Sequence, residues 1–266
     1  MLLYYITDRH QFPGNERRQQ ELLLAKIAEA ARAGVDYVQL RERDLSPRLL
    51  EQLARDALSA IEAGAPNFTT AAGPEPRTRL LINSRLDVVF ASGAAGVHLR
   101  SHDMAPSEVR AVWAKASRQR SSSAGLPPKS TPREYVRKPL VIAVSCHTVA
   151  EVLLAESHGA DFVVFAPVFE KVATPQAPGA GLPALAEACR SLGAAGPVEG
   201  VTVQPVRERD NLSSGTVRMP LLALGGVTLD NARACLRAGA AGIAAVRLFQ
   251  ENDVAEVVRQ LRAIER

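Results

Sequence analysis

The 266-residue sequence predicts a protein of the α/β class, a (β/α)8 TIM barrel with three surface insertions, and two observations support this. Short apolar runs alternate with amphipathic stretches along the whole chain, which is the pattern of repeated βα units around a parallel sheet. A near-repeat also recurs where a helix passes into the next strand, as in Gly-Val-Asp-Tyr-Val and Gly-Ala-Asp-Phe-Val. Barrels of this type commonly use such a length as one unit, so we expect a single domain over residues 1–266.

The expected elements can be placed by residue number. Eight apolar runs are the expected strands: Leu3–Ile6, Tyr37–Leu40, Leu80–Asn83, Gly96–Leu99, Leu140–Val144, Phe162–Phe165, Leu221–Leu224 and Gly242–Val246. The expected helices lie near residues 18–33, 46–63, 85–92, 106–116, 148–158, 182–192, 229–238 and 253–264. Residues that favour helix N-caps and C-caps support these boundaries. They are Ser46, Thr148 and Thr228 at the starts, and Gly34, Gly64, Gly93, Gly159 and Gly239 at the ends.

Three stretches interrupt the alternation, at 64–78, 117–137 and 193–219. Each is rich in Gly, Pro, Ser, Thr or charged residues, and loops of this length are uncommon inside compact domains. All three run from a helix into the next strand, which places them at the end of a barrel that lies away from the chemistry. We therefore expect surface insertions there.

Composition narrows the possible locations and partners. No apolar run approaches the roughly 18 residues of a membrane-spanning helix, and the N-terminus lacks the basic lead of a secretory signal. We therefore expect a cytoplasmic protein that binds no membrane. The net charge of +4 comes largely from scattered basic residues over 115–138 without a dense stripe, which argues against nucleic-acid binding. The cysteines share no metal-ligand spacing, so we expect reduced thiols and no structural zinc.

Polar residues follow nearly every expected strand, where the loops of such a barrel gather around one mouth. Gln39 and Arg41 alternate with core residues, so both can point into the mouth while Leu40 packs outward. Arg41 and Arg43 can hold phosphate oxygens bidentately. The alternative is a salt bridge to Glu42, to Asp8 or to a residue of a neighbouring strand.

A double glycine after the seventh expected strand also suits a phosphate. Gly225 and Gly226 precede a helix that begins after Thr228, and their bare backbone N–H groups can approach an anion closely. The loops after strands seven and eight are the recurrent phosphate site of this architecture. A tight turn would explain the two glycines equally well.

Two titratable residues have open roles at this stage. Asp103 ends the fourth βα loop and can hold Mg²⁺, which prefers one or two carboxylates plus substrate phosphates; it can equally cap a helix or pair with Arg100. His147 can act as a general acid or base near neutral pH. It can also hydrogen-bond a loop carbonyl, which the residue taken by itself favours.

The strand-end peptides resemble those of the thiamine-phosphate synthase family and its thiazole-tautomerase relatives. The resemblance runs from Tyr5 to Phe249, in order and correctly spaced apart from the insertions. It is carried by Tyr5-Ile6-Thr7-Asp8, Val38-Gln39-Leu40-Arg41-Glu42-Arg43, Leu81-Ile82-Asn83-Ser84-Arg85, Gly96-Val97-His98-Leu99 with Asp103, Val144-Ser145-Cys146-His147-Thr148, Gly159-Ala160-Asp161, Pro167-Val168-Phe169 and Leu224-Gly225-Gly226-Val227.

This resemblance implies a transferase that joins hydroxymethylpyrimidine diphosphate to a thiazole phosphate and releases diphosphate with the help of Mg²⁺. Asp103 is the implied metal ligand. The residues implied for the pyrimidine diphosphate are Gln39, Arg41, Arg43, Asn83 and Ser145. Those implied for the thiazole phosphate are Gly225, Gly226, Val246 and Arg247.

Departures from the family pattern leave alternatives open. Synthases usually have Asn-Asp-Arg where this chain has Asn83-Ser84-Arg85, so one metal carboxylate is missing. In the sixth loop Lys171 comes earlier than the lysine that contacts diphosphate in the family, and Arg247 stands where a small serine is common. We expect the synthase, with Lys171 and His147 among its catalytic residues. A metal-independent thiazole tautomerase using His147, and a non-catalytic barrel that binds thiamine or thiazole phosphate, are the alternatives. The sequence leaves the oligomeric state open, with a homodimer as one candidate.

Overall fold

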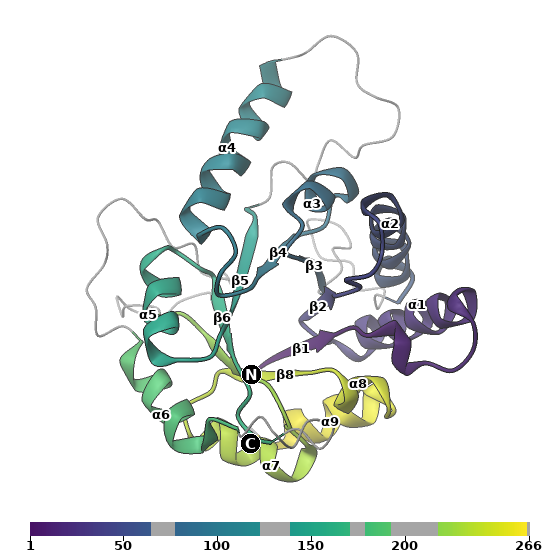
Figure 1. Ribbon diagram of the computed structural model, residues 1–266. Coiled ribbons are helices and arrows are strands. Elements are labelled where there is room, and N and C mark those ends of the chain that lie inside the picture. The colour runs from purple at the N-terminus through teal and green to yellow at the C-terminus, as the bar shows by residue number, and fades with distance from the viewer. Residues whose placement is uncertain (65–77, 123–138, 171–178, 193–217, 265–266) are drawn as a thin grey trace, which may run out of the picture.

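Parallel strands pair edge to edge until the sheet closes on itself, with the last strand hydrogen-bonded to the first in the computed structural model (Figure 1). The structure describes residues 1–64, 78–122, 139–170, 179–192 and 218–264. The strands are β1 (Leu2–Ile6), β2 (Tyr37–Leu40), β3 (Arg79–Asn83), β4 (Gly96–Leu99), β5 (Val141–Cys146), β6 (Phe162–Phe165), β7 (Leu221–Ala223) and β8 (Gly242–Ala245). The predicted (β/α)8 barrel and all of its strands are confirmed, with ends that shift by one or two residues.

Helices surround the strands, as the alternation predicts. They are α1 (Glu16–Ala33), α2 (Pro47–Gly64), α3 (Leu86–Ser92), α4 (Pro106–Ser122), α5 (Val149–Ser157), α6 (Gly181–Ser191), α7 (Leu229–Arg237), α8 (Arg247–Gln250) and α9 (Val254–Ile264), with a short 3-10 turn η1 (Arg9–Gln11). Thr148 caps α5 in a reciprocal capping box with Glu151, and Gly34 and Gly93 end α1 and α3 in the left-handed conformation. The turn η1 and helix α8 were not predicted, because one turn is too short to show a periodicity.

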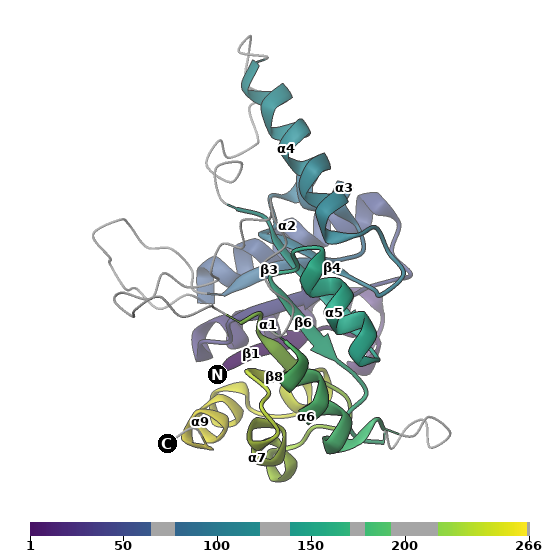
Figure 2. The ribbon, with the colours of Figure 1, turned by 90° about the vertical axis from the view of Figure 1, so that its left-hand side faces the viewer.

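One predicted boundary is wrong. The insertion expected over 117–137 begins too early, because α4 continues to Ser122 and extends beyond the rest of the barrel (Figures 1 and 2). The end of this helix, residues 117–122, is polar and basic and has no apolar face. Its sequence therefore shows no helical periodicity and predicts a loop. Most of the residues of the three expected insertions lie outside the described ranges. None of the helices within those ranges has the length and apolar character that crossing a membrane requires.

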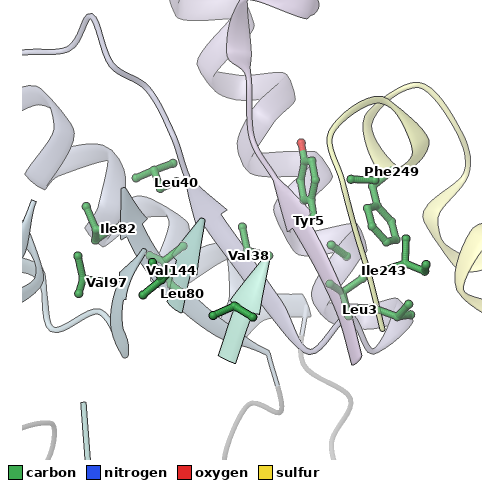
Figure 3. Packing of buried hydrophobic residues seen from close by; sticks show 14 of the residues in the cluster. Leu3, Tyr5, Val38, Leu40, Leu80, Ile82, Val97, Val144, Ile243 and Phe249 are labelled. Carbon is green, nitrogen blue, oxygen red and sulfur yellow. The ribbon is translucent and has the colours of Figure 1, made fainter. Parts of the chain in front are cut away.

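The core has two layers, one on each face of the sheet. Outward-facing residues such as Leu3, Val38 and Leu40 pack between the strands and the helices (Figure 3). Inside the barrel, the rings of Tyr4, Tyr37 and Phe162 lie with centroids 4.9–6.0 Å apart. This aromatic layer fills the middle of the barrel, so the inward-facing residues nearer the carboxyl ends of the strands form the floor of the mouth.

The near-repeat before β2 and β6 has a structural purpose. Asp36 accepts hydrogen bonds from the Leu3 amide at 2.9 Å and from Arg262 of α9 at 2.8 Å. Asp161 accepts them from the Ile142 amide at 2.6 Å and from Arg110 of α4 at 2.9 Å. Each carboxylate therefore joins the preceding strand to a helix. The two carboxylates themselves lie four strands apart around the barrel.

Replacing Asp161 with alanine leaves the Ile142 amide and the Arg110 guanidinium without this acceptor. The buried Ile142 amide left without an acceptor costs about 1–3 kcal/mol, and loss of the part-buried pair with Arg110 adds to this, so we expect the free energy of unfolding in urea to fall by about 3 kcal/mol. The control Glu21→Ala breaks a surface pair with Arg17 and should cost less than about 1 kcal/mol. Equal losses in the two variants would contradict this role for Asp161.

Candidate functional site

Polar side chains from four consecutive strands line the inside of the barrel at the mouth. They are Gln39 on β2, Asn83 on β3, His98 on β4 and Ser145 on β5. The Gln39 amide donates to Asn83 Oδ1 at 3.2 Å, and His98 Nε2 lies 2.7 Å from Ser145 Oγ. Asn83 and His98 are neighbours in the strand register. The structure thus brings three predicted site residues, Gln39, Asn83 and Ser145, together on one floor. His98, which was not predicted, lies on the same floor.

His98 is the residue that the sequence analysis missed. Its side chain is buried, with Nδ1 2.9 Å from the Tyr4 hydroxyl and Nε2 on Ser145. Burial lowers the pKa of His98 to about 3, and the nearby positive charge of Arg41 contributes. The ring is therefore neutral at physiological pH. Strand alternation could have found it, since Gly96 and His98 share the inward face of β4.

Arg41 is half-buried at this mouth. Its pKa is lowered by burial and then by the neighbouring Arg43, and the negative charges of Asp8 and Glu42 offset this only in part. No ion pair involves Arg41 within the described ranges. The carboxylate next to it in the chain, Glu42, pairs instead with Arg9 at 3.1 Å and accepts from the Thr7 hydroxyl at 2.6 Å. Among the described residues Arg41 therefore forms a salt bridge with neither Glu42 nor Asp8, and its guanidinium is available to an anion.

The loops after β1 and β2 are joined by a buried polar network that the sequence did not reveal. Arg9 and Glu42 are both almost fully buried, and the guanidinium of Arg9 also donates to Asp44 at 2.7 Å. Thr7 Oγ1 accepts from the Arg41 amide at 3.0 Å while donating to Glu42. This network positions the backbone of Arg41 at the rim.

The double glycine after β7 is required by close packing. A Cβ on Gly225 would lie 2.7 Å from Pro167 Cα, and one on Gly226 would lie 2.8 Å from the Glu170 carbonyl oxygen. Both residues have positive φ, at 95° and 63°. The tight-turn explanation is thus sufficient for the glycines themselves. Within the described residues, however, neither amide N–H of the pair donates a hydrogen bond, so both can still serve an anion.

The unexpected helix α8 lies next to this turn around the mouth. Val246 is its N-cap, and the Arg247 side chain is exposed. Gln250 anchors the helix, because it accepts from the Tyr5 hydroxyl at 2.9 Å and donates to the Asp8 carbonyl at 2.6 Å. A short extra helix after the eighth strand is a common part of phosphate sites in barrels of this type.

The predicted metal ligand Asp103 is already fully engaged. Its carboxylate accepts from the Ser84 hydroxyl at 2.6 Å, the Arg100 amide at 2.8 Å, and Arg100 Nε and Nη2 at 3.1 and 2.9 Å. Burial by itself would raise the pKa of Asp103, but the hydrogen bonds from Arg100 and Ser84 lower it overall. A carboxylate offers about four lone-pair positions, and all are used.

The described residues therefore do not form a preformed Mg²⁺ site. No group of three or more His, Cys, Asp or Glu residues within them could hold a metal ion. Ser84, at the position where the family pattern has an aspartate, supplies a hydroxyl proton to Asp103 in place of a second carboxylate. This geometry agrees with the alternative in which Asp103 pairs with Arg100.

The remaining predicted site residues are placed apart from this floor or are not described. His147 Nδ1 donates to the Ala166 carbonyl at 2.6 Å, which is the loop role, and its side chain is exposed. Arg43 is exposed beside the mouth. Lys171 lies outside the described residues.

The neutral state of His98 makes folding sensitive to acid. The unfolded chain binds a proton at this side chain below about pH 6.5, whereas the folded chain does so only near pH 3. Because the unfolded state binds more protons between these values, the free energy of unfolding falls as the pH falls. Relative to His98→Gln, we expect wild type to lose up to about 1.4 kcal/mol per pH unit below pH 6, measured by urea titration. Parallel pH profiles would contradict a buried neutral imidazole.

Ser84→Asp should restore a metal site. Ser84 has a φ of 57°, a backbone conformation that aspartate tolerates better than most residues. The variant places a second carboxylate beside Asp103, so Mn²⁺, followed by electron paramagnetic resonance as a substitute for Mg²⁺, should bind at least about tenfold more tightly than to wild type. Ser84→Asn is the uncharged control. Equal Mn²⁺ binding by all three proteins would contradict this interpretation.

Sequence comparisons with known proteins agree on one family. The thiamine monophosphate synthase family profile matches residues 3–117 and 126–249. The chain is 32% identical to the putative thiamine-phosphate synthase of Geobacter sulfurreducens over 265 residues, covering 98% of this chain and 93% of that protein. It is 31% identical to the thiamine-phosphate synthase of Methanoculleus marisnigri, covering 98% and 93%.

A solved structure supports the fold. The thiamine phosphate pyrophosphorylase from Pyrococcus furiosus superposes with a TM-score of 0.64 at 22% identity, covering 99% of this chain and 94% of that one. The relatives indicate a transferase, and thiamine-phosphate synthase is the function that the comparisons support. They favour neither the tautomerase nor a non-catalytic barrel. On the family profile and the sequence relatives together, this chain belongs to the thiamine monophosphate synthase family.

Proposed function

We propose that the mouth of this barrel binds hydroxymethylpyrimidine diphosphate and a thiazole phosphate and joins them into thiamine phosphate. In this reaction the bond between the pyrimidine methylene carbon and the diphosphate oxygen breaks, and its electron pair leaves with diphosphate. The thiazole nitrogen then supplies the pair that forms the new carbon–nitrogen bond. The protein mainly has to stabilise the negative charge that develops on the departing group, a task for fixed cations and oriented donors.

One observation carries the proposal. Arg41 is a half-buried guanidinium without an ion-pair partner among the described residues, beside a floor of neutral donors and acceptors. Leaving a desolvated cation unpaired is unfavourable unless a ligand supplies the negative charge. A diphosphate matches it, because a guanidinium binds phosphate oxygens bidentately. The exposed Arg43 follows two residues later and adds to the attraction.

The two substrates are assigned to different parts of the rim. Gln39 and Asn83 have amide groups suited to the polar edge of a pyrimidine, and Ser145, which contacts His98 on the next strand of the same floor, is assigned to the diphosphate. Gly225 and Gly226, with the N-terminus of α8 at Val246 and Arg247, suit the thiazole phosphate. These assignments follow the family resemblance and the positions of the side chains.

Mg²⁺ belongs to the family's chemistry, where it would share the charge of the diphosphate. The carboxylate of Asp103 is committed to Ser84 and Arg100, so we assign no step to a metal held there. The charge on the leaving diphosphate is assigned instead to Arg41, with the Ser145 hydroxyl as an additional donor.

The activity itself is the first test. Purified protein mixed with hydroxymethylpyrimidine diphosphate and thiazole phosphate should form thiamine phosphate and diphosphate in equal amounts, measured by chromatography and by a coupled diphosphate assay. Absence of both products, with and without added Mg²⁺, would remove the proposal.

Arg41→Gln should lower kcat/KM for the pyrimidine diphosphate by at least about tenfold, because the anion loses a charge-assisted bidentate partner. Arg41→Lys keeps the charge but loses the planar guanidinium, so its kcat/KM should lie between the values of wild type and Arg41→Gln. The matched control is Arg48→Gln, which removes the same charge from the exposed surface of α2. Equal activity in Arg41→Gln and Arg48→Gln would contradict the role of Arg41.

A further inference from the structure

A row of three hydrogen-bonded side chains crosses the inside of the barrel beneath the mouth. The Tyr4 hydroxyl on β1 lies 2.9 Å from His98 Nδ1, and His98 Nε2 on β4 lies 2.7 Å from Ser145 Oγ on β5. Tyr4 is fully buried and His98 is 2% exposed, while Ser145 is partly exposed at the mouth. The row therefore runs from the closed interior to the surface that meets the substrate.

Among the residues that the structure describes, Tyr4 has no acceptor other than His98 at the interior end of the row. The rings of Tyr37 and Phe162 pack against it edge-on, with centroids 6.0 and 5.5 Å away. Its hydroxyl makes no other hydrogen bond within the described part of the chain. A buried hydroxyl proton without an acceptor costs free energy, so the arrangement that places this proton on a partner is favoured.

A neutral imidazole carries one proton, so only two arrangements are possible. If Nδ1 carries it, His98 donates to the Tyr4 oxygen, the Tyr4 proton has no acceptor, and Ser145 must donate inward to Nε2. If Nε2 carries it, Tyr4 donates to Nδ1 and His98 donates to Ser145 Oγ. Only the second arrangement satisfies every group in the row and leaves the Ser145 proton directed toward the mouth.

We propose that Tyr4 and His98 are positioning residues that make Ser145 a hydrogen-bond donor to an oxyanion at the mouth. This rests on the proposed function, in which the oxyanion is a phosphate oxygen of the diphosphate. With the other tautomer, Ser145 would present a lone pair outward and would select a ligand with an N–H donor instead. The direction of two buried hydrogen bonds thus decides which chemical group the site accepts.

The tautomer can be read without any enzyme assay. In the full chain labelled with ¹⁵N-histidine, long-range ¹H–¹⁵N correlation distinguishes protonated from unprotonated ring nitrogens, and the His98 signals are those absent from His98→Gln. We expect Nε2 protonated and Nδ1 unprotonated throughout the neutral range. Protonation at Nδ1, or a doubly protonated ring, would overturn the proposal.

Binding of inorganic diphosphate, measured by calorimetry, tests the consequence. Ser145→Ala and His98→Leu should each weaken it by about tenfold, the loss of one hydrogen bond to a charged group. The variant that combines Ser145→Ala with His98→Leu should bind diphosphate no more weakly than either single variant. His98→Gln keeps an N–H that can reach Ser145, so it should recover much of the affinity. His158→Gln, at the end of α5, is the control for a lost imidazole and should bind as wild type does.

The two proposals fail in different ways. Additive losses in the double variant, or full affinity in His98→Leu, would overturn the positioning role even if the chain makes thiamine phosphate. The predicted tautomer together with coupled diphosphate binding, in a chain that forms no thiamine phosphate, would instead overturn the proposed function and leave the row intact. If His98→Leu does not fold, the tautomer measured in wild type still tests the positioning role of Tyr4 and His98.

Discussion

Closure of the sheet between β8 and β1 is the constraint on which the rest of the molecule depends. The main chains approach closely at this pairing and also at the pairing of β4 with β5. A Cβ on Gly242 of β8 would lie 2.0 Å from the Leu2 carbonyl oxygen, and one on Gly96 of β4 would lie 1.9 Å from that of Val141. Glycine is therefore required at the β8–β1 and β4–β5 pairings, which are four strands apart. Asp36 and Asp161 are also four strands apart. Asp36 binds Arg262 of α9 and Asp161 binds Arg110 of α4, so equivalent ion pairs join the two halves of the barrel.

Closure also brings the carboxyl ends of all strands to one rim, and the charges there are arranged unequally. Glu42 is satisfied by Arg9 and Thr7, and Asp103 by Arg100 and Ser84. These two carboxylates thus have local partners that satisfy them. Arg41 is left without an ion-pair partner among the described residues, and the proposed binding of an anion rests on this difference.

Ser84 shows how one side chain changes the character of such a site. An aspartate at this position would repel Asp103 unless a cation lay between them, because like charges at short distance are unfavourable in a partly buried site. The serine hydroxyl instead donates to Asp103 at 2.6 Å and completes its hydrogen bonding. The same substitution removes a metal ligand and stabilises the remaining carboxylate without a metal.

The amino-acid sequence by itself determined the number and order of the strands, the outward packing of Leu40, and the kinds of side chain that follow each strand. These features depend on local periodicity and on turn residues, which can be read within a short window. Only the tertiary structure decided which groups are paired. Glu42 meets Arg9 from 33 residues away, and His98 lies between Tyr4 and Ser145, which are 94 and 47 residues distant from it. Such partners are selected by the closed register of the barrel, and a local pattern carries no record of that register.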